Sequence, residues 1–190
     1  MRTFISIELK GGIKKKIGRA IKELKDAGAN VKWVEPGNLH VTLKFLGEVP
    51  DKDIENLIAL VSAAVKSSLS FKAEFMGTGS FPAGRHPRVI WIGTTKGGEE
   101  QSALASKLED GLCSAGFERE ARKFKSHITI GRVRESGNLA RVLKKLNELK
   151  CEPFGGMIVD HINIMKSKLS PKGPTYEIVK SLPLKIKKEE

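Results

Sequence analysis

Apolar and polar residues alternate strictly in two short stretches of the chain, and the same polar residues recur at the same places in both. In "NLHVTLKFLGE" the polar set begins with His40 and Thr42, and in "SHITIGR" it begins with His127 and Thr129. Strict alternation is typical of a β-strand with one buried face. We therefore expect two strands that each present a histidine and a threonine on the face opposite the core.

The remaining apolar periodicity predicts four helices and seven further strands. We expect helices over residues 13–24, 54–65, 104–112 and 139–146. Asp51 is expected to cap the second helix and Asn138 the fourth. The other strands are expected at residues 3–9, 31–34, 71–77, 88–93, 155–159, 161–169 and 176–182. The resulting order is β-α-β-β-α-β-β-α-β-α-β-β-β.

Short hairpin-like links mixed with helices favour an α+β fold with antiparallel or mixed sheets. No linker rich in Pro, Gly or Ser separates independent domains, so we expect residues 1–190 to form one domain. Two sheets could place the motif strands side by side, which would bring the two histidines together across a cleft.

Composition narrows the class of protein. The chain has 190 residues, 39% hydrophobic and 29% charged, with a formal net charge of +12. That charge favours an anionic partner such as nucleic acid. No apolar run approaches the roughly 20 residues of a membrane helix, and the N-terminus shows no signal-peptide pattern, so we expect a cytoplasmic protein with no membrane partner. Cys113 and Cys151 lack metal-ligand spacing and are interpreted as packing residues.

Two facing His-x-Thr units suit the cleavage of a phosphodiester. One imidazole can accept a proton from water while the other donates a proton to the departing oxygen. The hydroxyls of Thr42 and Thr129 can donate hydrogen bonds to phosphate oxygens. Arg132 adds a planar cationic donor suited to phosphate. This chemistry needs no metal or other cofactor.

Arg132 does not fit simple alternation, which places it on the face opposite His127. A bulge next to Gly131 could redirect it. Among other candidates, His86 is interpreted as solvated and His161 as a sheet or surface residue. Two arginines, Arg85 and Arg88, flank a Pro-rich loop as candidate RNA contacts.

Aromatic side chains could stack on a terminal base. For Phe45 and Trp91 the core interpretation is favoured, whereas Phe81 and Tyr176 lie beside loops and both interpretations stay open. Lys44 shares the His40 face under strict alternation, where it could attract the RNA backbone or simply be solvated.

The paired motifs resemble the signature of the two-histidine (2H) phosphoesterase superfamily. The blocks "RTFISIEL", "NLHVTLKFLGE", "FPAGRHPRVIWIG", "HITIGRVR" and "KSKLSPKGPTYE" resemble its RNA 2′,3′-cyclic phosphodiesterases, historically called 2′-5′ RNA ligases. The resemblance implies a bilobal, pseudo-twofold α+β fold with a basic cleft between the lobes. It implies metal-independent hydrolysis of an RNA-terminal 2′,3′-cyclic phosphate to a 2′-phosphomonoester, and 2′-5′ joining in reverse. It also implies that His40 is the proton donor and His127 the acceptor, while Thr42, Thr129 and Arg132 hold the phosphate.

Two alternatives stay open at this point. The same site could act on 2′-5′ oligonucleotides or small cyclic nucleotides, or the chain could be a basic RNA-binding module without catalysis. The sequence also leaves open whether tRNA fragments are the substrate and whether ATP or another nucleotide binds in the cleft. We expect a monomer, because no spare apolar stripe is evident.

Overall fold

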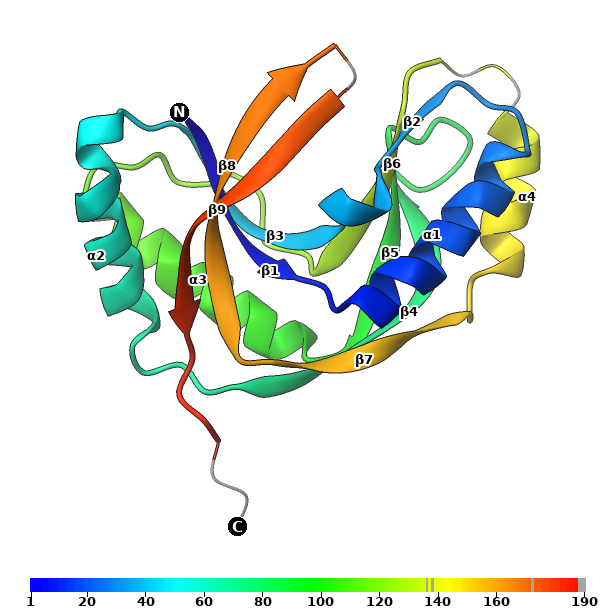
Figure 1. The fold of residues 1–190 in the computed structure, drawn as a ribbon. Coiled ribbons are helices and arrows are strands. Elements are labelled where there is room, and N and C mark those ends of the chain that lie inside the picture. The colour runs from blue at the N-terminus through cyan, green and yellow to red at the C-terminus, as the bar shows by residue number, and fades with distance from the viewer. Residues whose placement is uncertain (136, 138, 172, 188–190) are drawn as a thin grey trace.

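The computed structural model of the chain describes residues 1–135, 137, 139–171 and 173–187. These residues form four α-helices and nine strands in the order that the periodicity predicts, together with two short 3-10 helices that it does not predict (Figure 1). The helices are α1 (Gly11–Lys25), α2 (Ile54–Val65), α3 (Gly98–Cys113) and α4 (Leu139–Glu148), and the 3-10 helices are η1 (Pro36–Asn38) and η2 (Asp51–Asp53). The strands are β1 (Arg2–Glu8), β2 (Val31–Trp33), β3 (His40–Glu48), β4 (Phe71–Phe81), β5 (Val89–Lys96), β6 (His127–Val133), β7 (Pro153–Val159), β8 (His161–Ser170) and β9 (Gly173–Pro183).

All nine strands belong to one curled sheet rather than to the two sheets that we expected. Its order is β7-β4-β5-β6-β3-β1-β8-β9, and β2 pairs with the C-terminal part of β6 on the edge that β3 also meets. Two half-sheets join where β3 meets β6, through the single antiparallel pair Val41 and Ile128. This pair links residues that each follow a motif histidine, so the expectation that the motif strands lie side by side is confirmed.

Four strands follow one another outward on each side of this junction. On one side lie β3, β1, β8 and β9, and on the other lie β6, β5, β4 and β7. Each half therefore has its motif strand innermost and a C-terminal strand outermost, which agrees with pseudo-twofold symmetry.

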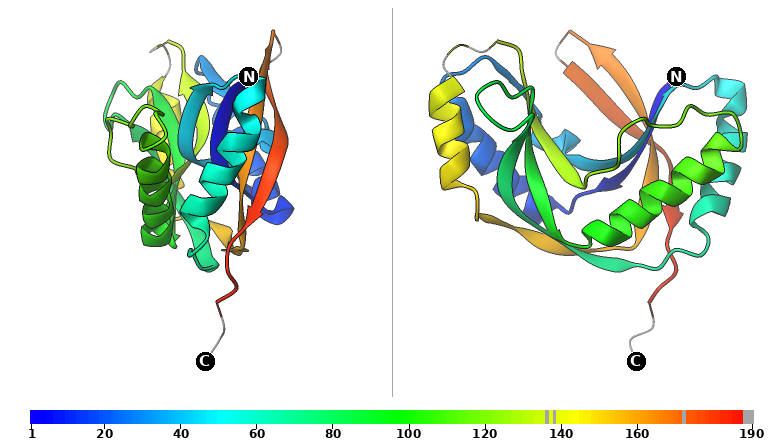
Figure 2. Two further views of the ribbon diagram at one scale, coloured as in Figure 1. Left: turned by 90° about the vertical axis from the view of Figure 1, so that its left-hand side faces the viewer. Right: turned by 180° about the vertical axis from the view of Figure 1, so that it is seen from behind.

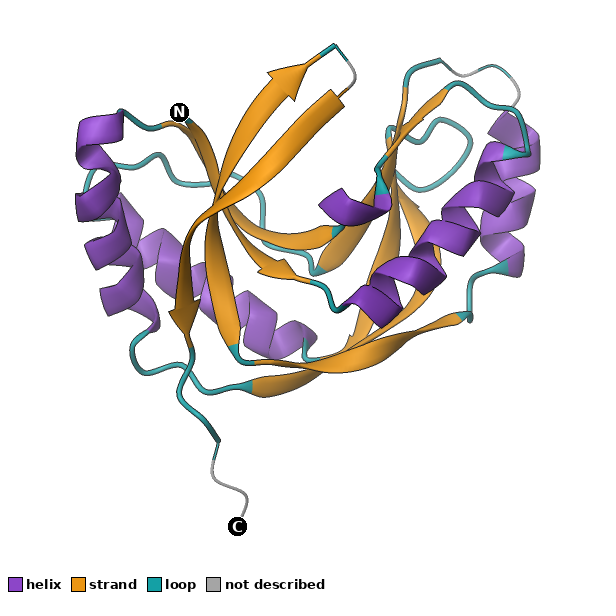
Figure 3. Cartoon of the chain, viewed as in Figure 1, coloured by secondary structure: helices purple, strands orange, loops and turns teal. Residues whose placement is uncertain are grey.

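The helices lie on the outside of the curled sheet (Figure 3). Helices α2 and α3 pack against each other, and α3 covers β3 and β5. Helix α1 contacts β7 and α4, and α4 contacts β4. The view from behind shows the two helix pairs at opposite ends of the molecule (Figure 2).

One apolar cluster runs beneath both half-sheets. It contains the fully buried junction residues Val41 and Ile128 together with the apolar stripes of α1, α2 and α3. Because the junction residues point into this cluster, their polar neighbours must point to the opposite face.

Three smaller expectations have different outcomes. Asp51 does not cap α2: it opens η2, and its carboxylate lies 3.9 Å from the N-terminal ammonium. Asn138 lies outside the described residues. Cys151 is exposed rather than packed, whereas Cys113 is half-buried. Among the described residues, none of the helices combines the length and hydropathy needed to span a bilayer.

Candidate active site

The junction between β3 and β6 gathers the motif side chains on one face of the sheet. Val41 and Ile128 are directly paired, so antiparallel register brings His40 toward the strand position of Thr129 and His127 toward that of Thr42. All four polar side chains are half-buried, whereas Val41 and Ile128 are fully buried. The structure therefore brings together the four residues that the alternation selected.

Both imidazoles are held through Nδ1 by a backbone carbonyl oxygen. His40 Nδ1 lies 2.7 Å from the Asn38 carbonyl oxygen, and His127 Nδ1 lies 2.6 Å from the Lys125 carbonyl oxygen. A carbonyl can only accept, so each Nδ1 carries a proton and donates it. Each Nε2 is thus the nitrogen left for chemistry, and it is an acceptor when the ring is neutral.

The two imidazoles differ at Nε2. His40 Nε2 lies 3.0 Å from Thr42 Oγ1, so in the neutral ring the threonine hydroxyl donates to it. Burial lowers the pKa of His40, the Asn38 carbonyl opposes that shift, and the charge of Lys14 lowers the pKa further. Burial also lowers the pKa of His127, again opposed by its backbone partner and reinforced by a positive charge, here Arg132.

Arg132 reaches this face because of a bulge, as the sequence had suggested. On β6, Thr129 pairs with Trp91 and Gly131 pairs with Ile90, so Ile130 is an extra residue in the ladder. The extra residue shifts the alternation by one position and turns Arg132 toward the His127 face. The charge of Arg132 accordingly adds to the effect of burial in lowering the pKa of His127, and it opposes the rise that burial causes in the pKa of Tyr176.

A second bulge, at the equivalent place on β3, overturns two expectations. Thr42 pairs with Ser6 and Lys44 pairs with Ile5, which leaves Leu43 as the extra residue. Lys44 is therefore buried on the α3 side, where its Nζ lies 2.5 Å from Glu109 Oε1, and it is not available to RNA. Phe45 is correspondingly 57% exposed rather than part of the core.

Aromatic side chains surround His40. The Phe4 ring lies 4.9 Å from the imidazole and 6.2 Å from Phe45. Tyr176 stands edge-on to both His40 and Phe4, at 5.3 and 5.0 Å between ring centroids. Tyr176 lies on β9, and the β8–β9 hairpin places it beside His40. Asn38 Nδ2 holds the hairpin in this position by donating a hydrogen bond to the Pro174 carbonyl at 2.8 Å.

A second aromatic pair lies beside His127. Phe81 stands edge-on to the imidazole at 5.2 Å and packs on Trp91 at 5.1 Å. Trp91 is half-buried and lies over Gly79, so its core interpretation is wrong. Lys125 Nζ lies 5.7 Å from the centre of the Phe81 ring.

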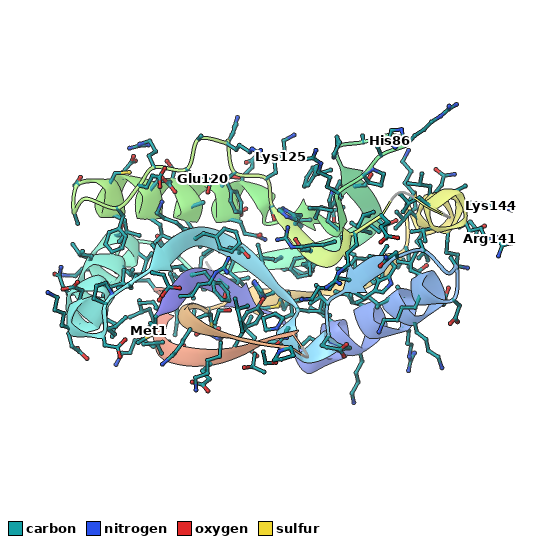
Figure 4. All side chains as sticks on the ribbon, turned by 90° about the horizontal axis from the view of Figure 1, so that it is seen from above. Met1, His86, Glu120, Lys125, Arg141 and Lys144 are labelled. Carbon is teal, nitrogen blue, oxygen red and sulfur yellow. The ribbon has the colours of Figure 1, made fainter. Side chains whose placement is uncertain are left out.

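The other histidines stay outside this arrangement. His86 is exposed in its loop, as expected, and lies along the same edge of the molecule as Lys125 (Figure 4). His161 opens β8 and pairs with Asp160 at 2.5 Å. Within the described ranges, no three His, Cys, Asp or Glu side chains cluster as a metal site would require.

Sequence patterns missed the roles of Phe4 and of the carbonyls of Asn38 and Lys125. Phe4 sits in an almost continuously apolar strand, where nothing marks its side chain as facing the site. The two carbonyls leave no residue-type signal, although each stands two residues before a motif histidine.

The match to known proteins agrees with this geometry. The family model described as LigT like Phosphoesterase matches residues 7–91 and again residues 92–176. The chain belongs to the LigT-like phosphoesterase family. The two matches divide the chain into two consecutive copies of the family unit, each containing one His-x-Thr motif.

Several relatives of this LigT-like chain are similar over nearly their whole length. A protein of Archaeoglobus fulgidus named RNA 2′,3′-cyclic phosphodiesterase is 38% identical, covering 93% of this chain and 97% of its own. One of the same name from Methanothermobacter thermautotrophicus is 34% identical over 93% of this chain and 95% of its own. A solved structure from Thermus thermophilus superposes with a TM-score of 0.81 at 26% identity, over 99% of this chain and 100% of its own.

Proposed function

We propose that this protein hydrolyses RNA-terminal 2′,3′-cyclic phosphates to 2′-phosphomonoesters, with the two motif histidines as acid and base. The observation that carries the proposal is the placement of both His-x-Thr units on one face at the β3–β6 junction, with each imidazole held through Nδ1 by a backbone carbonyl. Relatives that share more than 30% of their residues with this chain bear the name of this activity. We further propose that residues 1–190 act as one catalytic domain.

His127 takes the role of base. Its neutral ring carries the proton on Nδ1, so Nε2 can accept a proton from water as the water oxygen attacks phosphorus. Arg132 favours this neutral form by lowering the pKa of His127, and no ion pair engages Arg132 within the described part of the chain. Lys14, whose charge adds to the effect of burial in lowering the pKa of His40, forms an ion pair with Glu8, with 3.0 Å between Nζ and Oε1.

His40 takes the role of acid. As the P–O3′ bond breaks, protonated Nε2 gives its proton to the departing 3′ oxygen, while the phosphate stays on the 2′ oxygen. Burial disfavours this charged form in the free protein, but the negative charge of a bound phosphate raises the pKa of a neighbouring imidazole. Thr42 Oγ1 is then free to turn from the imidazole to a phosphate oxygen.

The two threonine hydroxyls and the Arg132 guanidinium are placed to hold the non-bridging oxygens. Negative charge builds on these oxygens as water adds, so donors fixed beforehand lower the barrier. Two imidazoles and these donors supply every proton transfer, and the mechanism therefore involves no metal. With the 5′-hydroxyl of a second RNA in place of water, the same acid–base pair would form a P–O5′ bond as the P–O3′ bond breaks, giving a 2′-5′ linkage.

The substrate that we propose is single-stranded RNA with a cyclic phosphate end, including tRNA fragments, bound by a monomer. The net charge of +12 suits such a polyanion. E. coli LigT, which shares this fold, has been crystallised with 3′-AMP and with ATP. In this protein, the groups proposed to hold the RNA phosphate, Thr42, Thr129 and Arg132, would also bind the phosphate of a nucleotide.

The test is hydrolysis of a short RNA with a 2′,3′-cyclic phosphate end in the presence of EDTA. We expect a 2′-phosphate product and a bell-shaped dependence of kcat/KM on pH. His40→Asn and His127→Asn should each lower kcat by about a thousandfold while thermal unfolding stays close to that of the parent protein. His161→Asn is the matched control and should keep full activity. A 3′-phosphate product would reverse the assignment of acid and base, and activity surviving in either motif variant would refute the pair.

A further inference from the structure

An apolar strip crosses the His40 half of the sheet on the same face as the motif. Phe45 pairs with Phe4, Phe4 with Met165, and Met165 with Ile178, so the four side chains form one row across β3, β1, β8 and β9. Paired residues of a sheet point to the same side, and the ring of Phe4 contacts His40. The whole strip therefore faces the site.

The strip is open to solvent at both ends. Phe45 is 57% exposed and Ile178 is 52% exposed, while Phe4 lies between them and is buried against His40, Phe45 and Tyr176. Three interstrand spacings separate the two ends, which is about 14 Å. A face of this length is longer than one nucleobase, so it has room for more than the terminal nucleotide.

The opposite half of the site adds cationic groups to its own aromatic pair, Phe81 and Trp91. Arg132 takes the place on β6 that Phe45 takes on β3, since each follows the bulge of its strand. Just beyond Arg132, a pocket is lined by Arg88, Arg134 and His86, with Glu135 at its side. One half thus offers apolar contact and the other offers aromatic rings and cationic donors, which together suit the bases and the phosphates of a single strand of RNA.

The proposed direction of cleavage selects which part of the RNA meets the strip. If His40 protonates the departing 3′ oxygen, the ribose lies on the His40 side and water approaches from the His127 side. The chain on the 5′ side of that ribose then continues over the His40 half. This step rests on the proposed function.

We propose that this strip binds nucleobases on the 5′ side of the cyclic phosphate through its exposed residues Phe45 and Ile178. Oligonucleotides should therefore bind more tightly and react with higher kcat/KM than mononucleotide 2′,3′-cyclic phosphates. The strip carries no group that reads base edges, so the preference is for the presence of bases and not for a particular sequence.

The experiment compares binding of two RNAs that have equal charge. One is a 5′-labelled single-stranded RNA ending in a 2′-phosphate, and the other has the same backbone but is abasic at every position except the last. Fluorescence anisotropy should show tighter binding of the first. Ile178→Ser should weaken that binding about fivefold, as expected for a half-exposed side chain that becomes covered. The abasic RNA should change by less than about twofold.

The matched control is Ile158→Ser, because Ile158 is 47% exposed on β7 and is not part of the strip. Equal weakening with both RNAs, or none with either, would overturn the strip as a base-binding surface. Sedimentation of the parent protein as a dimer that Ile178→Ser dissociates would assign the strip to self-association instead. Since binding of a product-like RNA needs no turnover, this result stands apart from any failure of the proposed hydrolysis.

Discussion

Removing Lys44 should destabilise the fold much more than removing a lysine from an equally short surface ion pair. Lys44 is 4% exposed, and its Nζ donates to Glu109 Oε1 at 2.5 Å and to the Glu118 carbonyl at 2.9 Å. Lys44→Met leaves the Glu109 carboxylate, whose side chain is 17% exposed, without its cation. Breaking a buried pair from one side costs about 3 kcal/mol or more. For Lys44→Met we expect a loss of about 3 kcal/mol, because Glu109 still accepts a hydrogen bond from the Glu120 backbone N–H at 3.1 Å.

The control is Lys168→Met in the pair of Lys168 with Glu177, where Nζ and the carboxylate oxygen are 2.6 Å apart but both side chains are more than half exposed. An exposed pair contributes less than about 1 kcal/mol. Urea unfolding followed by tryptophan fluorescence measures both free energies of unfolding. The double variant Lys44→Met/Glu109→Gln should recover part of the loss, because no unpaired carboxylate then remains.

Equal losses of stability for Lys44→Met and Lys168→Met would refute the reasoning. They would mean that Lys44 is solvated, and hence that β3 continues its simple alternation through Leu43. The measurement therefore also tests the bulge that places Phe45 beside the site.

Three further predictions concern the site itself. Arg132→Gln removes the positive charge that lowers the pKa of His127, so this pKa should rise. Because the base must be neutral, the rising acidic limb of kcat/KM should move to higher pH, and a limb that stays in place would show that Arg132 acts elsewhere. Thr42→Val should lower kcat/KM about a hundredfold by removing a donor to the phosphate, and a change below about threefold would remove Thr42 from that role. Gly79→Ala should displace Trp91, because a Cβ at Gly79 would stand 2.3 Å from its ring. It should lower the free energy of unfolding by about 1–3 kcal/mol in urea titrations, and a neutral result would show that the ring moves freely.

Several features of this protein were determined by its sequence alone. Period-2 and period-3.6 patterns are local, and they were long enough here to give every helix and strand in the right order. The repeated His-x-Thr pattern also selected the four side chains that meet at the β3–β6 junction, since alternation puts residues two apart on the same face. The resemblance to the 2H phosphoesterases is confirmed by family membership.

Only the tertiary structure decided where alternation breaks. A bulge arises when one strand carries an extra residue relative to its neighbour, and that depends on a partner that the local pattern does not contain. For this reason the sequence placed Lys44 and Phe45 on the wrong faces, and could offer a bulge only as one way for Arg132 to reach the site. The joining of two expected sheets into one likewise depends on a single pair, Val41 with Ile128, which no periodicity marks. Local patterns thus specified the elements and the residues proposed as acid and base, whereas long-range strand register set which further side chains surround them.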